Sequence, residues 1–240
     1  MAPDIQFRVE GLEPKQRGAL TTANEVLARL SARRRGQVRV EGLFARSKLA
    51  WKLAILQESF LQRAVMLAHG VALTWNAGNL VTSILAARAL FESVVLVEDC
   101  HGRIDAFLKA EDLGGINQLL ENQTFATRDA EWLAQHPESQ AINILTLIDK
   151  FDKRIFPGAR EHYDSLSERC HPNSRGHFGM FASLDRSSGT VTFSDDKSAK
   201  TDRIAIMPAV MLLRLLERTM GSLDQAISTA GELQHRVNPV

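Results

Sequence analysis

The segment around residue 171 gathers several side chains that could perform acid–base chemistry. His171 and His177 lie six positions apart, and Arg175 stands between them. Imidazoles exchange protons near neutral pH, and a guanidinium binds phosphate through paired hydrogen bonds. This set therefore suits proton transfer beside an anionic group. We predict His171 and His177 as candidate catalytic residues and Arg175 as a candidate ligand-binding residue.

The helix that leads into this segment places further polar groups on one face. Tyr163, Ser167 and His171 are spaced four apart, and Pro172 ends the helix. We predict Tyr163, Ser167 and the following Asn173 as ligand-binding residues. A Ser–His nucleophile pair is disfavoured, because one helical turn rarely gives in-line geometry and no Gly-x-Ser-x-Gly motif is present. Alternatively, His171 caps the helix, where its cation faces the negative end of the dipole, and Asn173 forms the turn.

An apolar stretch from residue 80 to 109 contains a second polar pair. Arg88 and Glu92 stand four residues apart among apolar neighbours. An unpaired buried charge costs about 3–5 kcal/mol, so the two side chains either pair to fix helix register or line a polar cleft. The cleft interpretation makes Arg88 and Glu92 candidate catalytic residues. The preceding turn contains Asn76 and Asn79, which we include as candidate ligand-binding residues.

Both cysteines are followed by histidine, at Cys100-His101 and Cys170-His171. The two dipeptides could form a zinc site only if they met, and adjacent helical residues point about 100° apart. Zinc-ligand pairs are normally separated by two to four residues. We therefore predict no metal site. The chain contains no phosphate-binding, dinucleotide-binding or His-Glu-x-x-His motif, so we also predict no cofactor.

Composition limits the classes of function. Hydrophobic residues make up 45% of the 240 residues and charged residues 24%, enough to bury a core. The 29 basic and 28 acidic residues nearly cancel, which argues against a dedicated nucleic-acid binder. Two cysteines cannot form a disulfide framework, and the N-terminus lacks a signal-peptide pattern, so we expect a cytoplasmic protein. The apolar run 80–97 carries two charges in its middle, which favours a core helix over a membrane span.

Hydrophobic periodicity predicts most of the secondary structure. Apolar residues recur at three and four positions in several segments, which indicates helices at 15–35, 44–75, 80–109, 142–155, 160–170 and 206–235. Pro208 is tolerated in the last helix if it falls in the first turn. Residues 1–13 lack a clear period and are expected to form a loose lead-in. Gly114-Gly115 and the polar segment 121–140 predict a less regular connection with one short helix.

One segment alternates with a period of two. Residues 181–193 predict a β-hairpin around a turn at 185–189, which is either a lid over the site or a dimer contact. The predicted fold class is therefore all-α: a multi-helix bundle with long antiparallel helices and one small hairpin. We expect a single domain over 1–240, with a helical core at 44–235.

Three short motifs resemble those of bacterial all-helical proteins of the DUF5677 type and related HEPN-like sequences. The motifs are Trp75-Asn76 with Asn79, Ala87 to Glu92, and Leu166-Ser167 followed by Cys170-His171-Pro172-Asn173 and Gly176-His177. The resemblance implies a helical bundle, often dimeric, in the bacterial cytoplasm. Many HEPN proteins are ribonucleases of toxin or defence systems that use an Arg-x(4–6)-His motif. The literal match here, Arg63 to His69, lies in an apolar helix, and chance alone would give about two such matches.

Two hypotheses of function follow. The favoured one is a ligand-binding or protein-interaction module without chemistry, in which the apolar faces of 44–97 and 206–227 serve homodimerisation. The alternative is a HEPN-like ribonuclease or phosphotransfer-type enzyme that uses His171 and His177 with Arg88 and Arg175. RNA is a possible partner, although the charge balance does not support it.

Overall fold

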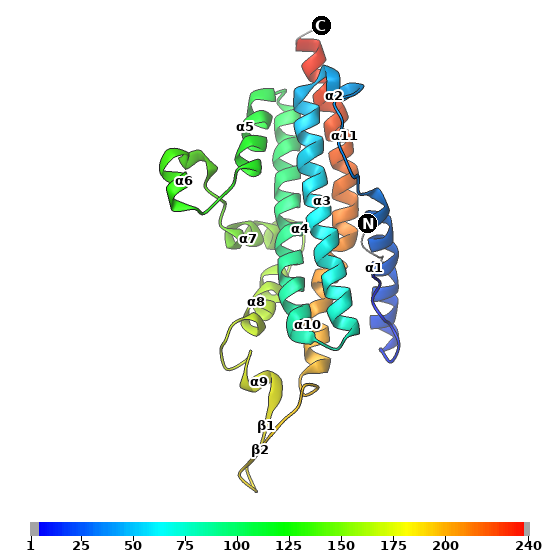
Figure 1. Cartoon of the computed structure of the whole chain (residues 1–240), viewed down its shortest axis with the longest axis vertical. Helices are drawn as coiled ribbons and strands as arrows, with labels where there is room; N and C mark the ends of the chain where they lie inside the picture. Colours follow the sequence, from blue (N-terminus) through cyan, green and yellow to red (C-terminus); the bar gives the residue numbers. More distant parts are fainter. Residues whose placement is uncertain (1–4, 238–240) are drawn as a thin grey trace.

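The computed structural model describes residues 5–237, and the statements below refer to this range. Two long helices, α3 (Lys48–Asn76) and α4 (Leu80–Lys109), run antiparallel along the middle of the molecule (Figure 1). The turn between them ends at Asn79, whose side chain caps α4 by accepting a hydrogen bond from the Thr82 N–H at 3.1 Å. The long helices and the small hairpin described below confirm the predicted all-α fold class.

Three more helices complete this central part of the bundle. α11 (Leu213–Val237) packs along α3 and α4, and α10 (Ala199–Met211) precedes it with only Leu212 between them. α1 (Pro14–Arg33) packs against α11, α10 and α3 on the outside of the bundle. Their apolar residues join those of α3 and α4 in one continuous hydrophobic core.

The start of the last helical segment differs from the prediction. Helix α10 begins at Ala199, so Pro208 lies in its interior and not in a first turn. A proline there lacks the N–H that would bond to the preceding turn, and its ring crowds that turn's carbonyl. The helical segment is interrupted at Leu212, four residues after the proline.

The connection after α4 is more regular than the sequence predicts. Helix α5 (Leu113–Thr124) follows directly, and the Asp112 carboxylate caps it by accepting from the Gly115 N–H at 2.8 Å. A Cβ at Gly115 would lie 2.5 Å from the Phe107 ring, so this glycine permits close packing. The sequence predicts a less regular connection with one short helix, whereas both glycines lie inside the 12-residue helix α5. The chain then forms two short helices, α6 (Ala130–Gln135) and η1 (Pro137–Ser139).

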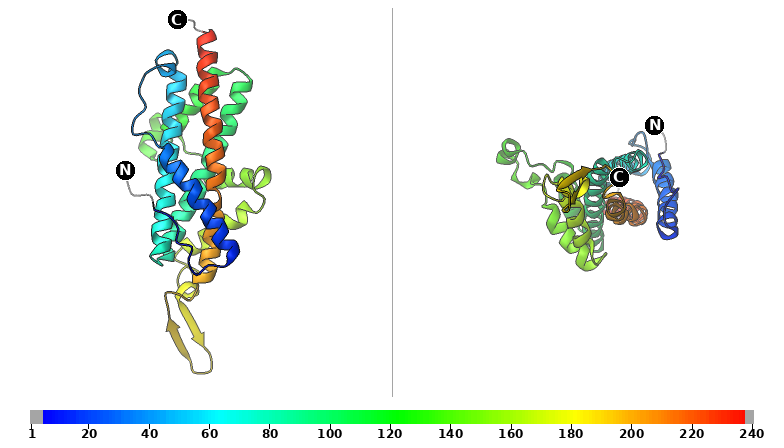
Figure 2. Two further views of the ribbon diagram at one scale, coloured as in Figure 1. Left: turned by 90° about the vertical axis from the view of Figure 1, so that its right-hand side faces the viewer. Right: turned by 90° about the horizontal axis from the view of Figure 1, so that it is seen from below.

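The remaining elements cover the other side of α4 and one end of the bundle. Helices α7 (Ile144–Arg154) and α8 (Ala159–Cys170) pack against α4. A short helix and a hairpin follow: α9 (Phe178–Phe181), β1 (Ala182–Asp185) and β2 (Thr190–Phe193). The strands pair antiparallel with Asp185 opposite Thr190, which confirms the predicted hairpin. Figures 1 and 2 show that the hairpin projects beyond the end of the bundle.

The N-terminal lead-in is packed onto the bundle. Residues 5–9 form no regular structure, but Phe7 is buried and lies edge-on to Trp75 with ring centroids 6.1 Å apart. The Asn24 side chain accepts from the Phe7 N–H at 2.8 Å and donates to its carbonyl at 3.0 Å. Residues 5–13 are therefore not the loose segment that we expected, and residues 1–4 lie outside the described range.

Helix α4 occupies the centre of this arrangement. Among residues 5–237 it is the one helix long and apolar enough to cross a membrane by length and composition. It packs against α3, α5, α7, α8, α10 and α11, as expected of a core helix. The sequence predicts that apolar faces of α3, α4 and α11 serve dimerisation, but the apolar residues of these helices are largely buried in the core of the chain itself. Homodimerisation stays a prediction.

Candidate functional site

Three of the predicted site residues meet between α4 and α8, and we call them the α4–α8 cluster. The Tyr163 hydroxyl donates to Glu92 Oε1 at 2.8 Å and accepts from Arg88 Nη2 at 3.0 Å. Arg88 and Glu92 also pair directly, with Nε and Oε1 3.2 Å apart. Each polar group therefore finds its partners within the cluster.

Burial makes these contacts matter for stability. Tyr163 is buried, and the side chains of Arg88 and Glu92 are only 29% and 30% exposed. Desolvation is the largest influence on the pKa of Arg88 and lowers it. The hydrogen bond to Tyr163 and the charge of Glu92 outweigh that effect, so the pKa is raised overall. Arg88 remains a cation held between its two partners, which matches the interpretation that the pair fixes helix register.

A cysteine borders the same cluster. Cys170 lies two helical turns after Tyr163 on α8 and is half-buried. Desolvation raises the pKa of its thiol, and the nearby Arg88 guanidinium only partly opposes this. Burial raises the pKa of Cys100 in α4 more strongly, to about 12. Both side chains are therefore thiols at neutral pH and not nucleophilic thiolates.

The loop after α8 is organised by one amide. Asn173 Oδ1 accepts from the backbone N–H groups of Arg175 and Gly176, both at 2.9 Å, and its Nδ2 donates to Glu168 at 2.9 Å. The His171 N–H donates to the Ser167 carbonyl at 3.1 Å and closes the helix end. The backbone and amide contacts of this segment thus match the turn-forming alternative.

The two histidines stay apart from the α4–α8 cluster. His171, His177 and Arg175 are exposed, and among the described residues no hydrogen bond or ion pair joins them to Arg88 or Glu92. His177 borders a separate hollow at the base of the hairpin, beside three phenylalanines: Phe178, Phe181 and Phe193. Arg88 and Glu92 thus make no direct hydrogen bond or ion pair with these imidazoles among the described residues.

The two predicted asparagines are also engaged within the chain. Asn76 donates to the Gln6 carbonyl and accepts from the Arg8 N–H, both at 2.7 Å, and so ties the N-terminal segment to α3. Asn79 caps α4. Their polar atoms serve the fold.

A buried ion pair that sequence reasoning missed anchors α8 to α10. Arg169 Nε lies 3.0 Å from Asp202 Oδ1, and the two side chains are 10% and 3% exposed. Arg169 Nη1 also donates to the Ser165 carbonyl at 2.8 Å, and the Ser198 hydroxyl donates to Asp202. The sequence pattern predicts that this helix starts at residue 206. Asp202 therefore lies outside the predicted helix, whereas it is an acidic residue of the first turn of α10.

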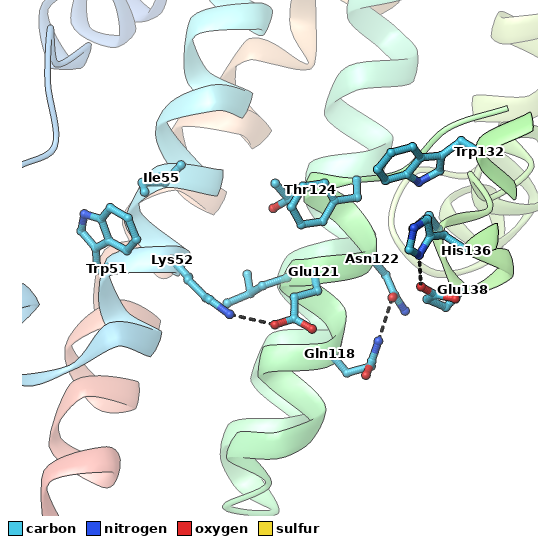
Figure 3. Close-up of a pocket in the computed structure, with 13 residues that line it drawn as sticks. Trp51, Lys52, Ile55, Gln118, Glu121, Asn122, Thr124, Trp132, His136 and Glu138 are labelled. Carbon is cyan, nitrogen blue, oxygen red and sulfur yellow. Dashed lines mark hydrogen bonds and ion pairs between the residues drawn. The ribbon is translucent and has the colours of Figure 1, made fainter. Parts of the chain in front are cut away.

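A cavity of about 800 Å³ lies elsewhere, between α3, α5 and the α6–η1 segment (Figure 3). We call it the aromatic cavity. It is lined by Trp51, Lys52, Ile55, Gln118, Leu120, Glu121, Asn122, Thr124, Phe125, Trp132, His136, Glu138 and Ser139.

Its walls expose more aromatic surface than a bundle normally leaves in solvent. Trp51 and Ile55 stand four apart on α3, so they share a helix face. On the far side, Phe125 is 56% exposed and Trp132 is 47% exposed. The Trp132 and His136 rings are in contact at a tilt of 33°, with centroids 4.6 Å apart. Several ring faces therefore remain accessible to a ligand.

The polar groups of the aromatic cavity are paired along its walls. Lys52 Nζ lies 2.9 Å from Glu121 Oε1 and 2.6 Å from Asn117 Oδ1. These hydrogen bonds, from Lys52 first and Asn117 second, lower the pKa of Glu121. His136 Nδ1 lies 3.4 Å from Glu138 Oε1 at the other end. The lining thus combines ring faces with polar groups held in fixed positions.

The segment that carries Trp132 is closed at its base. The Thr127 N–H donates to the Ser139 carbonyl and its carbonyl accepts from the Ala141 N–H, both at 2.9 Å. Within this loop, the Asp129 carboxylate caps α6 by accepting from the Trp132 N–H at 2.9 Å. Residues 128–139 therefore form a loop with fixed ends, which holds Trp132 opposite α3 and α5. Large aromatic residues within this polar stretch were the signal that could have indicated the site.

The fold and this site define an all-α bundle with a cavity of mixed aromatic and polar lining. No known family model, curated protein or solved structure matches the chain. The resemblance to HEPN-like sequences stays a prediction.

Proposed function

We propose that this chain is a ligand-binding protein and that the aromatic cavity is its binding site. The observation that carries the proposal is a cavity of about 800 Å³ with accessible rings and fixed polar groups. Small-molecule sites are typically concave, about 300–1,000 Å³, and lined by apolar and aromatic side chains with a few polar ones. The aromatic cavity has all three properties.

The α4–α8 cluster is a weaker candidate for the same role. A ligand that bound Arg88 would have to replace Glu92 and the Tyr163 hydroxyl, which already satisfy the guanidinium. Leaving Tyr163 without a partner in a buried position would cost about 1–3 kcal/mol. A ligand in the aromatic cavity displaces solvent from ring faces and breaks none of these contacts.

The proposal is tested by filling the aromatic cavity. Thr124 lines it from an exposed position at the end of α5, so Thr124→Phe should occupy space without disturbing the core. Gln123→Phe adds the same ring one residue earlier, outside the lining, and serves as the matched control. Binding of small aromatic compounds would be followed by ligand-observed nuclear magnetic resonance.

We expect the wild type and Gln123→Phe to bind a shared set of compounds, and Thr124→Phe to lose them. The proposal fails if no compound binds the wild type. It also fails if the compounds that do bind are unaffected by Thr124→Phe.

A ribonuclease remains the second candidate, for one structural reason. His171, His177 and Arg175 are exposed on a single loop, and their side chains form no ion pair among the described residues. Such groups are available to an RNA substrate. Cleavage of single-stranded RNA by the wild type and its loss in a folded His171→Ala variant would support this function. Equal or absent cleavage in both proteins would remove it.

A further inference from the structure

We infer that the aromatic cavity binds an organic cation that carries a planar aromatic ring. This inference rests on the proposed function, because it names the class of ligand for the same site. It follows from three properties of the lining: its charge, the arrangement of its rings and its rigidity.

The charge of the lining disfavours anions. Among residues 5–237, the cavity is lined by one lysine and two glutamates, and by no arginine. The Lys52 ammonium is already bound by Glu121 and Asn117, which leaves it little capacity for a ligand carboxylate or phosphate. The remaining carboxylate, Glu138, has only the His136 ring as a charged or chargeable partner, at 3.4 Å. One negative charge therefore lacks a permanent counter-charge.

The unbalanced carboxylate lies beside the best available ring for a cation. Figure 3 shows Trp132, His136 and Glu138 grouped at one end of the cavity, away from Trp51 and Lys52. A cation over a tryptophan face is attracted by the ring quadrupole, and tryptophan is the strongest of the aromatic residues in this respect. His136 neighbours both groups, 4.6 Å from the Trp132 ring between centroids and 3.4 Å from the Glu138 carboxylate, so a positive group on the open indole face would lie in the field of that carboxylate.

The opposite end suits the aromatic part of such a ligand. Trp51 and Ile55 from α3 supply apolar surface there. Ring pairs prefer offset-stacked or edge-to-face contacts, which Trp51 can make with a planar ligand. The cavity volume of about 800 Å³ accommodates a fused ring system that reaches from this wall to Trp132.

The cation-binding end is preformed. The Trp132 backbone is fixed by the Asp129 cap, and its ring is in contact with the His136 ring. The Thr127 contacts to Ser139 and Ala141 close the base of the loop. Since these groups are ordered before a ligand arrives, little conformational entropy is lost on binding.

The test uses three compounds with the same tricyclic ring and different charge. At mildly alkaline pH, 9-aminoacridine is a cation, acridine is neutral and acridine-9-carboxylate is an anion. Affinities for the full-length chain would be measured by isothermal titration and by fluorescence anisotropy. We expect 9-aminoacridine to bind about tenfold more tightly than acridine, the size of effect a cation–π contact and a nearby carboxylate can give. Acridine-9-carboxylate should bind most weakly.

Substitutions at Glu138 and Trp132, with a control at Glu131, assign the preference to the proposed groups. Glu138→Gln keeps the shape of the side chain and removes its charge, and should reduce the preference for 9-aminoacridine over acridine several-fold. Glu131→Gln removes an exposed carboxylate of the preceding helix α6 that does not line the cavity, and should leave the preference unchanged. Trp132→Ala should weaken 9-aminoacridine, and Trp132→Phe should restore part of the affinity.

The outcomes separate this inference from the proposed function. If acridine or its carboxylate binds as tightly as the cation and Thr124→Phe abolishes that binding, the ligand class is wrong and the cavity remains a binding site. A preference for the cation that persists in Glu138→Gln also overturns the inference. If none of the three compounds binds, the inference fails, and the fragment experiment then decides whether the proposed function fails with it.

Discussion

The α4–α8 cluster and the aromatic cavity both contain paired charged side chains, within α4 in the first and between α3 and α5 in the second, yet they differ in what remains accessible. In the cluster, the Tyr163 hydroxyl satisfies Arg88 and Glu92, and its ring is buried. In the cavity, Lys52 and Glu121 pair in the wall while the Trp132 ring stays exposed. In the α4–α8 cluster, closely spaced polar residues thus form a fixed internal contact. In the aromatic cavity, paired charges lie beside exposed rings, which is the arrangement that we propose for ligand binding.

The largest expected difference between a structural contact and the cavity concerns the Arg169–Asp202 ion pair, which joins α8 to α10. Asp202→Ala would leave the Arg169 guanidinium almost buried without its counter-charge. We expect the free energy of unfolding to fall by about 3–5 kcal/mol, measured by urea denaturation. Binding of aromatic compounds at the cavity should be unchanged under conditions where the variant is folded.

A double substitution controls for the loss of volume. Arg169→Met with Asp202→Leu replaces both charges by apolar groups and should recover much of the lost stability. A double variant as unstable as Asp202→Ala would show that packing, and not the unpaired charge, sets the cost.

A smaller loss of stability is expected within the α4–α8 cluster. Tyr163→Phe removes one hydroxyl that bonds to two charged groups, while Arg88 and Glu92 keep their direct contact at 3.2 Å. We expect a loss of about 1–2 kcal/mol in the free energy of unfolding. An unchanged affinity for aromatic ligands would support the assignment of this cluster to the fold. A reduced affinity in the folded variant would contradict it.

Thiol reactivity tests whether Arg88 influences its surroundings as the geometry implies. Burial raises the pKa of Cys170 and Arg88 opposes it, so Arg88→Met should raise that pKa further. Less thiolate forms at a given pH, and alkylation of Cys170 by iodoacetamide should slow several-fold, as followed by mass spectrometry. Cys100, with a pKa of about 12, is an internal control that should stay almost unreactive in both proteins. Faster alkylation of Cys170 in the variant would contradict the prediction if unfolding is excluded.

The smallest effect concerns the charge pair of the cavity wall. Lys52 and Asn117 lower the pKa of Glu121, so this carboxyl should titrate below the ordinary range of a glutamate. A lowered pKa in the folded state stabilises the fold above the unfolded-state pKa, and this contribution is lost as pH falls through the folded-state value. Nuclear magnetic resonance should show the midpoint moving up in Lys52→Met. The wall pairing is refuted if the midpoint is the same in both proteins.

Much of the fold could be predicted from the sequence because it depends on local periodicity. The apolar spacing of α3, α4 and α7 and the alternation around the hairpin turn were sufficient to place these elements. The prediction failed where packing overrides local preference. Gly115 lies inside a helix because its lack of a side chain allows Phe107 to approach, which no local pattern shows.

The candidate site was predictable only in part. The four-residue spacing of Arg88 and Glu92 indicated a pair, but their joint partner Tyr163 lies 71 residues beyond Glu92. The aromatic cavity is lined by residues of α3 and of a loop about 80 positions later. The loop is closed at Thr127 by backbone hydrogen bonds, which no side-chain pattern predicts. Long-range juxtapositions of this kind require the fold itself.

The closure at Thr127 has a consequence for how this protein could change over time. The two ends of the loop 128–139 meet at Thr127, so this loop could be replaced by another without moving the helices of the bundle. Substituting another loop between the same two anchor points would alter the ring and the carboxylate that meet a ligand. Selectivity could then diversify in one short segment while the helices that provide stability are inherited unchanged.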